Sequence, residues 1–252
     1  MRVCVLQAGR AAPEARARRG DYGAMFVELL AEPGERWTVW DVRDAAAPER
    51  PARWTDHDAY LITGSTRAAY DDRPWIADLL QTARELHAAR IPLVGVCFGA
   101  QIVAQGLGGR VVPNPAGWEL GIREVSLTSA GRGLPLLGEA PTPLRILETH
   151  MDIVERLPPG AVRLGESPRT PVELFALGDA VLGLQGHPEM DNPMIVEIAE
   201  GLGERLPADR RAEALASLAA EAHVPFLRRL LRAFLTREAD LLAGLRGLPP
   251  GA

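Results

Sequence analysis

One cysteine of this chain has a glycine two residues away on each side. The segment GVCFGAQ places Gly95 before Cys97 and Gly99 after it, between an apolar run and a helical pattern. A nucleophile on a sharp strand-to-helix turn needs small neighbours, because the backbone bends tightly there. We expect the thiol to stand exposed near the positive end of the following helix, which favours the thiolate. The pattern predicts that Cys97 is a nucleophile and that Cys4, within an apolar strand, is a core residue.

A cysteine nucleophile needs a base, and the chain has five histidines. His187 stands in LQGHPEM, where the following proline favours extended backbone. Residues two apart in an extended chain point to the same side, so Glu189 can reach the imidazole and hold its tautomer. Cys97, His187 and Glu189 would then serve as nucleophile, base and orienting carboxylate. His150, which has the carboxylate of Asp152 two residues later, is the alternative base.

Acyl transfer also requires N–H donors for an oxyanion. One candidate is the backbone N–H of Phe98, directly after the nucleophile. The second candidate comes from the segment ITGST, where an apolar run ends in Gly64 and Ser65. A glycine-led turn at this place would point a backbone N–H toward the space above Cys97.

The composition limits the other functions that the chain can have. Its 252 residues suit one α/β domain or a domain with an appendage, and a net charge of −5 gives no reason to expect nucleic acid as a partner. We expect neither a membrane span nor a signal peptide, and two cysteines suit a reducing cytoplasm. All 28 basic residues are arginine, which excludes lysine-dependent sites such as a phosphate loop. No clustered ligand set indicates a metal, so we predict neither a metal nor a cofactor.

The elements that must position these residues alternate in the first part of the chain. Because strands alternate with helices, we predict an α/β fold with a mostly parallel central sheet flanked by helices. Cys97 then lies at the carboxyl end of a strand, where open parallel sheets bind ligands. Residues 13–23 are expected to form a polar loop at the same edge, which could gate the pocket. The predicted strands are residues 2–8, 36–42, 59–64 and 91–96, and the predicted helices are 22–32 and 74–90.

The pattern changes after Gly109, where short strands follow one another without intervening helices. They predict an antiparallel or mixed sheet added to the parallel one. The chain from Asn192 onward is helical, and its last six residues are expected to be frayed. The apolar stripe around Leu230 packs on the domain and leaves a solvated basic face, or alternatively forms a surface for a partner or a second copy. The strands are 121–128, 144–150, 161–167, 172–178 and 180–186, the helices are 193–206, 209–223 and 225–245, and the basic residues are Arg228, Arg229 and Arg232.

The motifs GVCFGAQ and GHPEM together resemble those of the class I, or triad, glutamine amidotransferases. The resemblance runs from about Met1 to Met190 and implies a flavodoxin-like catalytic domain of residues 1–190, followed by a helical extension of residues 191–252 packed on it. It implies a γ-glutamyl thioester on Cys97, with Gln101 holding the bound glutamine. The segment THMDIV, with Thr149 and His150, matches a stretch near the substrate. Many members have Gly-Gly where this chain has Gly64-Ser65. The segments ITGST, AYDDRPWI and GWELG look closest to stand-alone GMP-synthase-like amidotransferases and the related γ-glutamyl peptidases.

Three functions follow from the sequence. The resemblance favours hydrolysis of the glutamine side-chain amide, which releases ammonia, with a synthase partner as a possible acceptor and a homodimer as a possible assembly. Hydrolysis of a γ-glutamyl bond in a peptide is the first alternative, because the chemistry is the same and only the leaving group differs. A non-catalytic binding module of the same fold is the second alternative, and the intact triad argues against it.

Overall fold

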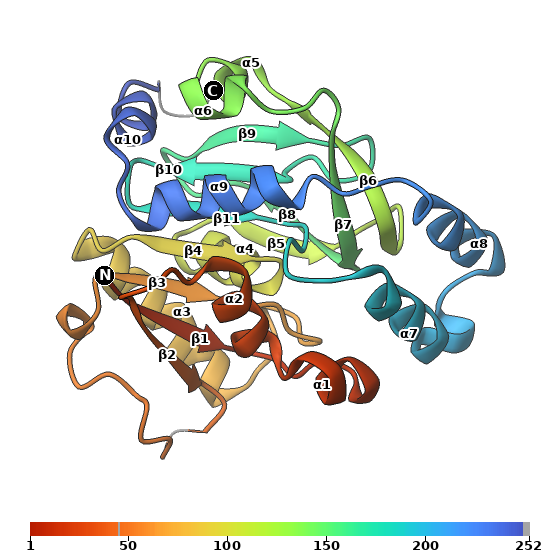
Figure 1. Ribbon diagram of the computed structural model, residues 1–252, viewed down its shortest axis with the longest axis horizontal. Coiled ribbons are helices and arrows are strands. Elements are labelled where there is room, and N and C mark those ends of the chain that lie inside the picture. Colours follow the sequence, from red (N-terminus) through yellow and green to blue (C-terminus); the bar gives the residue numbers. More distant parts are fainter. Residues whose placement is uncertain (45, 249–252) are drawn as a thin grey trace.

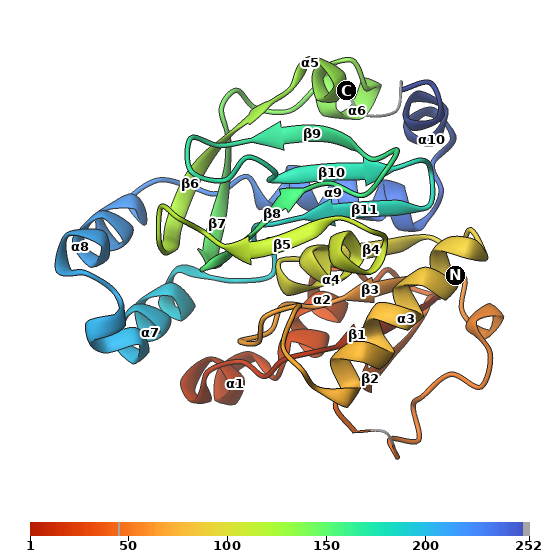
Figure 2. The ribbon, with the colours of Figure 1, turned by 180° about the vertical axis from the view of Figure 1, so that it is seen from behind.

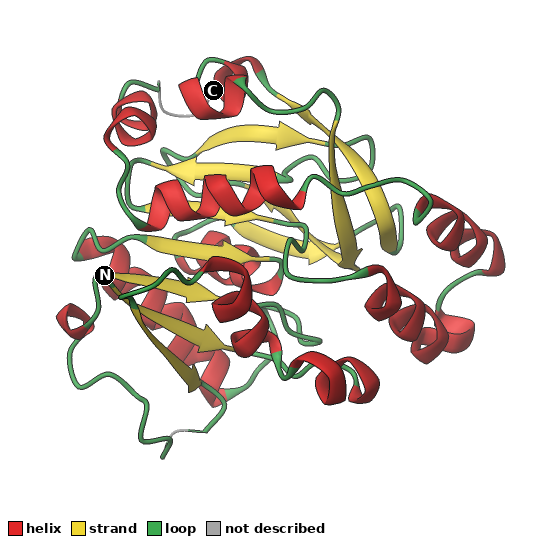
Figure 3. Ribbon diagram, viewed as in Figure 1, coloured by secondary structure: helices red, strands yellow, loops and turns green. Residues whose placement is uncertain are grey.

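The computed structural model describes residues 1–44 and 46–248. Its central feature is a nine-stranded sheet. Its strand order is β2-β1-β3-β4-β11-β10-β9-β6-β7, and a separate two-stranded sheet pairs β5 with β8. Figure 3 shows helices against both faces of the central sheet, so the predicted α/β class is confirmed. The strands are β1 Arg2–Gln7, β2 Arg36–Asp41, β3 Ala59–Ile62, β4 Leu93–Val96, β5 Arg110–Pro113, β6 Glu119–Leu127, β7 Leu144–His150, β8 Asp152–Arg156, β9 Val162–Glu166, β10 Leu174–Leu177 and β11 Val181–Leu184.

The helices cover the sheet in two layers. Helices α2 and α9 lie in front of the sheet in Figure 1, whereas α3 and α4 lie on the opposite face, as the reverse view in Figure 2 shows. None of the helices within the described residues is both long and apolar enough to cross a bilayer. The helices are α1 Pro13–Arg19, α2 Tyr22–Leu30, α3 Pro74–Ala88, α4 Phe98–Gly106, α5 Ser129–Arg132, α6 Pro135–Gly138, α7 Asn192–Leu202, α8 Ala208–Ser217, α9 Val224–Leu235 and α10 Ala239–Arg246, with short 3-10 turns η1 Trp54–Asp56 and η2 Gly203–Arg205.

The sheet is parallel from β2 to β11 and antiparallel beyond. Strand β1 pairs with β2 and β3, β3 with β4, and β4 with β11, all in parallel. Strands β10, β9, β6 and β7 continue in antiparallel pairs. Alternate residues of β1 face opposite layers, so that Val3 and Val5 pack with α2, whereas Cys4 and Leu6 pack with α3 and α4. Cys4 is therefore a core residue, as predicted.

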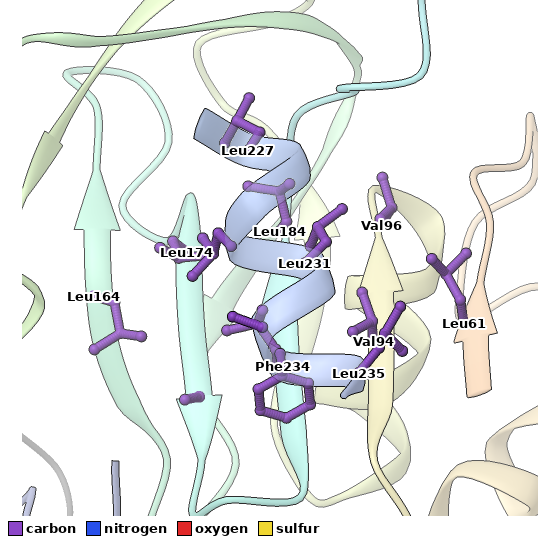
Figure 4. Packing of buried hydrophobic residues seen from close by; sticks show 14 of the residues in the cluster. Leu61, Val94, Val96, Leu164, Leu174, Leu184, Leu227, Leu231, Phe234 and Leu235 are labelled. Carbon is purple, nitrogen blue, oxygen red and sulfur yellow. The ribbon is translucent and has the colours of Figure 1, made fainter. Parts of the chain in front are cut away.

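Helix α9 covers the middle of the sheet. Its apolar residues lie over β4, β11 and β10, as Figure 4 shows. Both Leu231 and Phe234 are fully buried in this cluster together with Val94, Val96 and Leu184. The backbone that carries Cys97 thus has part of its cover from the C-terminal quarter of the chain. The division of the chain into residues 1–190 and 191–252 stays a prediction.

The expectation that residues 13–23 form a loop is wrong, because Pro13–Arg19 is helix α1 and Tyr22 begins α2. Proline at the first position suits a helix start. The carboxylate of Glu197 in α7 accepts the N–H groups of Glu14 at 2.8 Å and Ala15 at 2.9 Å. The residue that supplies this cap lies about 180 positions away in the sequence, but local signals are also present, with Pro13 at the start, Glu14 in the first turn and arginines in the last turn.

The region after Gly109 contains more elements than predicted. Two one-turn helices, α5 and α6, lie between β6 and β7, where the sequence predicted none. The side chain of Thr128 caps α5 by accepting the N–H of Gly131 at 3.1 Å. The paired strands β5 and β8 were also not predicted, because each is short and together they form a sheet apart from the central one.

The last predicted helix, residues 225–245, is two helices. Helix α9 ends at Leu235 and α10 begins at Ala239, with Arg237 in left-handed backbone at φ 57°. No glycine or proline marks this break, so it was missed. Of the residues predicted to be frayed, 249–252 lie outside the described part of the chain.

The basic face of α9 is not simply solvated. Arg228 and Arg232 form ion pairs with Glu32 and Glu35 after α2, and Arg229 pairs with Glu139 at 2.6 Å. These arginines therefore hold α9 to neighbouring segments of the same chain, which corrects the expectation of a free basic surface.

Candidate active site

Cys97 lies at the turn between β4 and α4, in strained backbone. Its φ of 52° and ψ of −110° are uncommon for a residue with a side chain. The backbone N–H of Cys97 donates to the carbonyl of Leu184 in β11 at 2.8 Å. The side chain is 5% exposed, so the expectation of an exposed thiol is wrong. Segments from β7 and from the turn after β11 close over it, and the thiol faces a cavity instead of open solvent.

The two glycines beside Cys97 are required by close backbone contacts. A Cβ at Gly99 would lie less than 3.0 Å from the carbonyl oxygen of Ile62 in β3, and a Cβ at Gly95 would meet the backbone of Gly99. The first turn of α4 therefore lies directly against β3 and β4. This packing fixes the turn that carries Cys97, which is the role predicted for glycines at this spacing.

His187 and Glu189 form a buried hydrogen-bonded pair. The Nδ1 atom of His187 lies 2.7 Å from Oε1 of Glu189, and both side chains are almost completely buried. A carboxylate only accepts, so Nδ1 carries the proton and the lone pair of a neutral ring would lie at Nε2. Nε2 makes no hydrogen bond to any described residue. The His-Pro-Glu spacing thus produces the orientation that the sequence predicted.

The charge on His187 depends on its two neighbours. Burial alone lowers the pKa of His187, but the Glu189 carboxylate and the Cys97 sulfur outweigh burial and raise this pKa well above its ordinary value of 6.5.

Strands β4 and β11, which end beside Cys97 and before His187, pair in register with Val96 opposite Leu184. One strand pair therefore brings together two side chains that are far apart in the sequence.

The candidate oxyanion donors surround the same point. Phe98 is the first residue of α4, so its N–H has no partner within the helix. A Cβ at Gly64 would lie 2.9 Å from Cε1 of His187, and therefore only glycine lets the imidazole approach this turn. The N–H groups of Gly64 and Ser65 make no hydrogen bond to a described residue. The structure brings these three residues next to Cys97 and His187.

A cavity of about 520 Å³ opens above Cys97 and His187. This volume lies within the range of about 300–1,000 Å³ that is typical of small-molecule sites. Ser65 and neighbouring residues of the loop after β3 line one side, and Trp118, Ile198 and Leu202 form an apolar wall on another. Three guanidinium groups also line the cavity, those of Arg10, Arg67 and Arg205.

Apart from Ser65, these lining residues were not predicted. Trp118 stands in GWELG, a segment noted only for its resemblance, and the residues that stand in no quoted motif are Arg10, Arg67, Ile198, Leu202 and Arg205. The apolar wall shows that α7, which the sequence placed outside the catalytic motifs, contributes directly to the cavity.

The predicted substrate-contacting residues all line the cavity. The amide nitrogen of Gln101 donates to the carbonyl of Asp152 at 2.9 Å and lies 3.3 Å from Oε1 of Gln185. The carbonyl oxygen of Thr149 lies 4.0 Å from the sulfur of Cys97. Gln101 therefore uses its amide nitrogen within the protein, and Thr149 faces the thiol.

His150 is not oriented by the carboxylate of Asp152, as the sequence suggested. Its Nδ1 lies 3.1 Å from the backbone carbonyl of Asp152, whereas the Asp152 side chain accepts the hydroxyl of Tyr70 at 3.0 Å. The other ring nitrogen, Nε2, lies 3.4 Å from Oε2 of Glu148 and 3.7 Å from Oε2 of Glu119. His150 belongs to a buried acidic cluster and does not form a second triad.

This acidic cluster lies behind the cavity. Glu119, Glu148 and Glu173 are buried together with His150, and Thr170 donates its hydroxyl to Glu119. Burial is the main cause that raises the pKa of Glu148 to about 8, and it raises that of Glu173 as well. Single atoms of Glu148, Glu173 and His150 lie within 4.8 Å of one another, close enough to contact one metal ion. The predicted metal independence of the site stays a prediction.

Comparisons with known proteins agree on one family. The family model for "Glutamine amidotransferase class-I" matches residues 21–193. Gamma-glutamyl peptidase 3 of Arabidopsis thaliana is 32% identical over 184 residues, which cover 72% of this chain and 74% of that protein. A GMP synthase of Neisseria meningitidis is 33% identical over 172 residues, which cover 68% of this chain but only 32% of the synthase. The crystal structure of a glutamine amidotransferase from Thermotoga maritima is 25% identical, with a TM-score of 0.72, and the match covers 94% of this chain and 97% of that one.

Proposed function

We propose a function from one premise, that this chain belongs to the class I glutamine amidotransferase family. It hydrolyses γ-glutamyl amide bonds through a thioester on Cys97. The observation that carries this proposal is one cavity lined by both Cys97 and His187, with Glu189 bound to the imidazole at 2.7 Å. Nucleophile, base and orienting carboxylate are the three groups that nucleophilic acyl transfer needs.

In the first half of the reaction, Nε2 of His187 takes the proton of the Cys97 thiol, and the sulfur attacks the γ-carbonyl carbon. A C–S bond forms, and the carbonyl oxygen becomes an oxyanion that accepts hydrogen bonds from the N–H groups of Phe98 and of Gly64 or Ser65. When the oxyanion collapses, the C–N bond breaks and the leaving nitrogen takes the proton from Nε2 of His187. The products of this step are a γ-glutamyl thioester and a free amine.

In the second half, water attacks the thioester and gives its proton to Nε2 of His187. The second oxyanion collapses with cleavage of the C–S bond, which releases glutamate, and the departing sulfur takes the proton back from Nε2 to restore the thiol. Glu189 keeps Nδ1 protonated throughout, so that Nε2 is always the nitrogen that exchanges the proton. None of these steps requires a nucleotide or a metal.

We propose a γ-glutamyl peptide as the substrate class. The cavity volume of about 520 Å³ leaves room for a leaving amine larger than ammonia, and Trp118, Ile198 and Leu202 offer it an apolar contact surface. The Arabidopsis relative that matches about three quarters of its own length is named as a γ-glutamyl peptidase, which supports the same choice.

Glutamine is the second candidate. The matching part of the Neisseria relative is about a third of a glutamine-hydrolysing GMP synthase, and this supports ammonia release to a separate acceptor protein. A partner of this kind would raise a low turnover of glutamine by the isolated chain.

The test is a hydrolysis screen of glutamine, γ-glutamyl dipeptides and glutathione, each with the wild type and with Cys97→Ala. We expect release of glutamate from a γ-glutamyl peptide by the wild type, and a loss of at least 10³-fold in the variant. Mass spectrometry after acid quench should detect a γ-glutamyl adduct on Cys97 alone. Turnover that survives Cys97→Ala would refute the mechanism, and faster hydrolysis of glutamine than of every peptide would select the second candidate.

A further inference from the structure

Glu148 lies between the two backbone groups that contact the candidate base and nucleophile. It belongs to β7, the last strand of the central sheet. Before it, the carbonyl of Leu147 accepts the backbone N–H of His187 at 2.7 Å. After it, the carbonyl oxygen of Thr149 lies 4.0 Å from the Cys97 sulfur. A shift of β7 at Glu148 would therefore move both contacts.

The carboxyl group of Glu148 touches the site from behind. Its side chain is 0% exposed. A Cβ at Gly186, the residue before His187, would lie less than 3.0 Å from Oε1 of Glu148, so the carboxyl group packs directly against this glycine. The other oxygen, Oε2, lies 3.4 Å from Nε2 of His150, which lines the cavity. The side chain thus joins the turn before His187 to the ring of His150.

The positions of the protons on His150 and Glu148 follow from the groups that these side chains contact. The carbonyl of Asp152 only accepts, so Nδ1 of His150 carries a hydrogen toward it. That leaves Nε2 of His150, 3.4 Å from Oε2 of Glu148, as the ring atom to which a protonated carboxyl group could donate. The charged and titratable groups that face Glu148 are Glu119 and Arg123 of β6, His150 of β7, Glu173 before β10, and His187 after β11.

Neutrality of Glu148 also agrees with its surroundings. No N–H or hydroxyl group of a described residue donates to its oxygens, and the nearest carboxyl group is that of Glu173, so a charged Glu148 would be costly. Burial, with a smaller contribution from the charge of Glu119, raises the pKa of Glu148 to about 8, which favours the neutral acid.

We infer that Glu148 is a positioning residue, which packs under Gly186 as a neutral acid and donates a hydrogen bond to Nε2 of His150. The contact with Gly186 holds β7 in the place from which Leu147 contacts the base and Thr149 the nucleophile, and the hydrogen bond orients the His150 ring within β7. The kinetic part of this inference rests on the proposed function.

Two substitutions separate the possible roles of Glu148. Glu148→Gln keeps a neutral donor of nearly the same shape, whereas Glu148→Leu keeps the apolar volume and removes the donor. We expect kcat of Glu148→Gln to stay near that of the wild type and kcat of Glu148→Leu to fall by about 10²-fold, with a smaller change in KM, as for a small misplacement of catalytic groups. Leu164→Ala, a buried change in β9, is the control, since it lowers stability without a fall in kcat.

A second readout needs no substrate. The rate at which iodoacetamide alkylates Cys97, followed by mass spectrometry, should fall in Glu148→Leu and not in Glu148→Gln. If the wild type hydrolyses no γ-glutamyl compound, the proposed function fails, while the alkylation rates still test this inference. If Glu148→Leu kept the kcat and the alkylation rate of the wild type, the inference would be overturned. It would also be overturned if Glu148→Gln lost as much kcat and alkylation rate as Glu148→Leu. One zinc or manganese ion per purified chain, lost in Glu148→Gln, would also overturn it in favour of a metal site.

Discussion

Replacing Leu231 by alanine tests whether α9 is part of the core that supports the nucleophile strand. Leu231 is 0% exposed and packs with Val94, Val96 and Leu184 beneath the middle of α9 (Figure 4). Removing its side chain takes apolar contacts away and leaves a cavity between a helix and a sheet. Buried Leu→Ala changes cost about 2–5 kcal/mol, and more where the surroundings cannot collapse.

The cost at Leu231 should lie in the upper half of that range. Strands β4 and β11 are central and hydrogen-bonded on both sides, so they cannot move into the space, and the ion pairs of Arg228 and Arg232 hold α9 in place. We therefore expect a loss of about 3–5 kcal/mol in the free energy of unfolding. In a chain of this size, each kcal/mol lowers the melting temperature by about 2–4 °C.

The assay is urea unfolding followed by circular dichroism, with calorimetry as a second measurement. Leu215→Ala is the matched control, because Leu215 lies on α8 and is 39% exposed, and we expect a change within about 0.5 kcal/mol. If Leu231→Ala unfolds within 0.5 kcal/mol of the wild type, α9 does not support the core, and the role assigned to it here is wrong.

Three further predictions concern the site. Glu189→Gln should move the alkaline limb of the kcat/KM profile to lower pH, because the carboxylate helps to keep the imidazolium of His187 protonated to higher pH; an unmoved limb would contradict this assignment. Gly99→Ala should lower the free energy of unfolding by about 1–3 kcal/mol or more and reduce activity, because the new Cβ meets the backbone of β3. Gly201→Ala is the control, because no atom lies within 4 Å of its new Cβ, and it should be neutral or stabilising in the same urea assay. Incubation with EDTA should leave turnover unchanged, and a loss restored by added zinc would show that the reaction depends on a metal.

The turn at Cys97 was predictable because its signal is local. Gly95 reports a close backbone contact with Gly99 four residues later, and the His-Pro-Glu spacing reports the extended geometry that directs Glu189 to His187. Gly99 lies against Ile62 in β3, and this partner is not visible from the spacing. The parallel arrangement of the first strands followed from their alternation with helices. In each case, neighbours in the sequence carry most of the constraint.

The acidic cluster was not predictable in the same way. Glu119, Glu148 and Glu173 come from separate segments, and the contacts between them depend on how β6, β7 and β10 are ordered in the sheet. The sequence does contain one sign, since the segments LRILETH and PVELF each place a carboxylate within an apolar run. A burial constraint on such residues is visible in the sequence, but their partners are not.

Helix α1 and the break before α10 show a second limit. The N-terminus of α1 depends on a cap from Glu197, and the left-handed residue at the break is Arg237, not a glycine. At α1 this cap adds to local helix signals, whereas at the break no glycine or proline marks the change, so propensity alone gives the wrong boundary there.

The position of α9 affects how the protein folds during its synthesis on the ribosome. Strand β4 and the turn at Cys97 are synthesised before the chain has reached its midpoint, but the helix that covers β4, β11 and β10 emerges only near the end. Translation proceeds at about 5–20 residues per second, so this apolar face stays uncovered for several seconds in every nascent chain. A product that stops before Val224 would retain Cys97, His187 and Glu189 but expose the apolar face of the central strands, and we expect chaperones or proteases to recognise it.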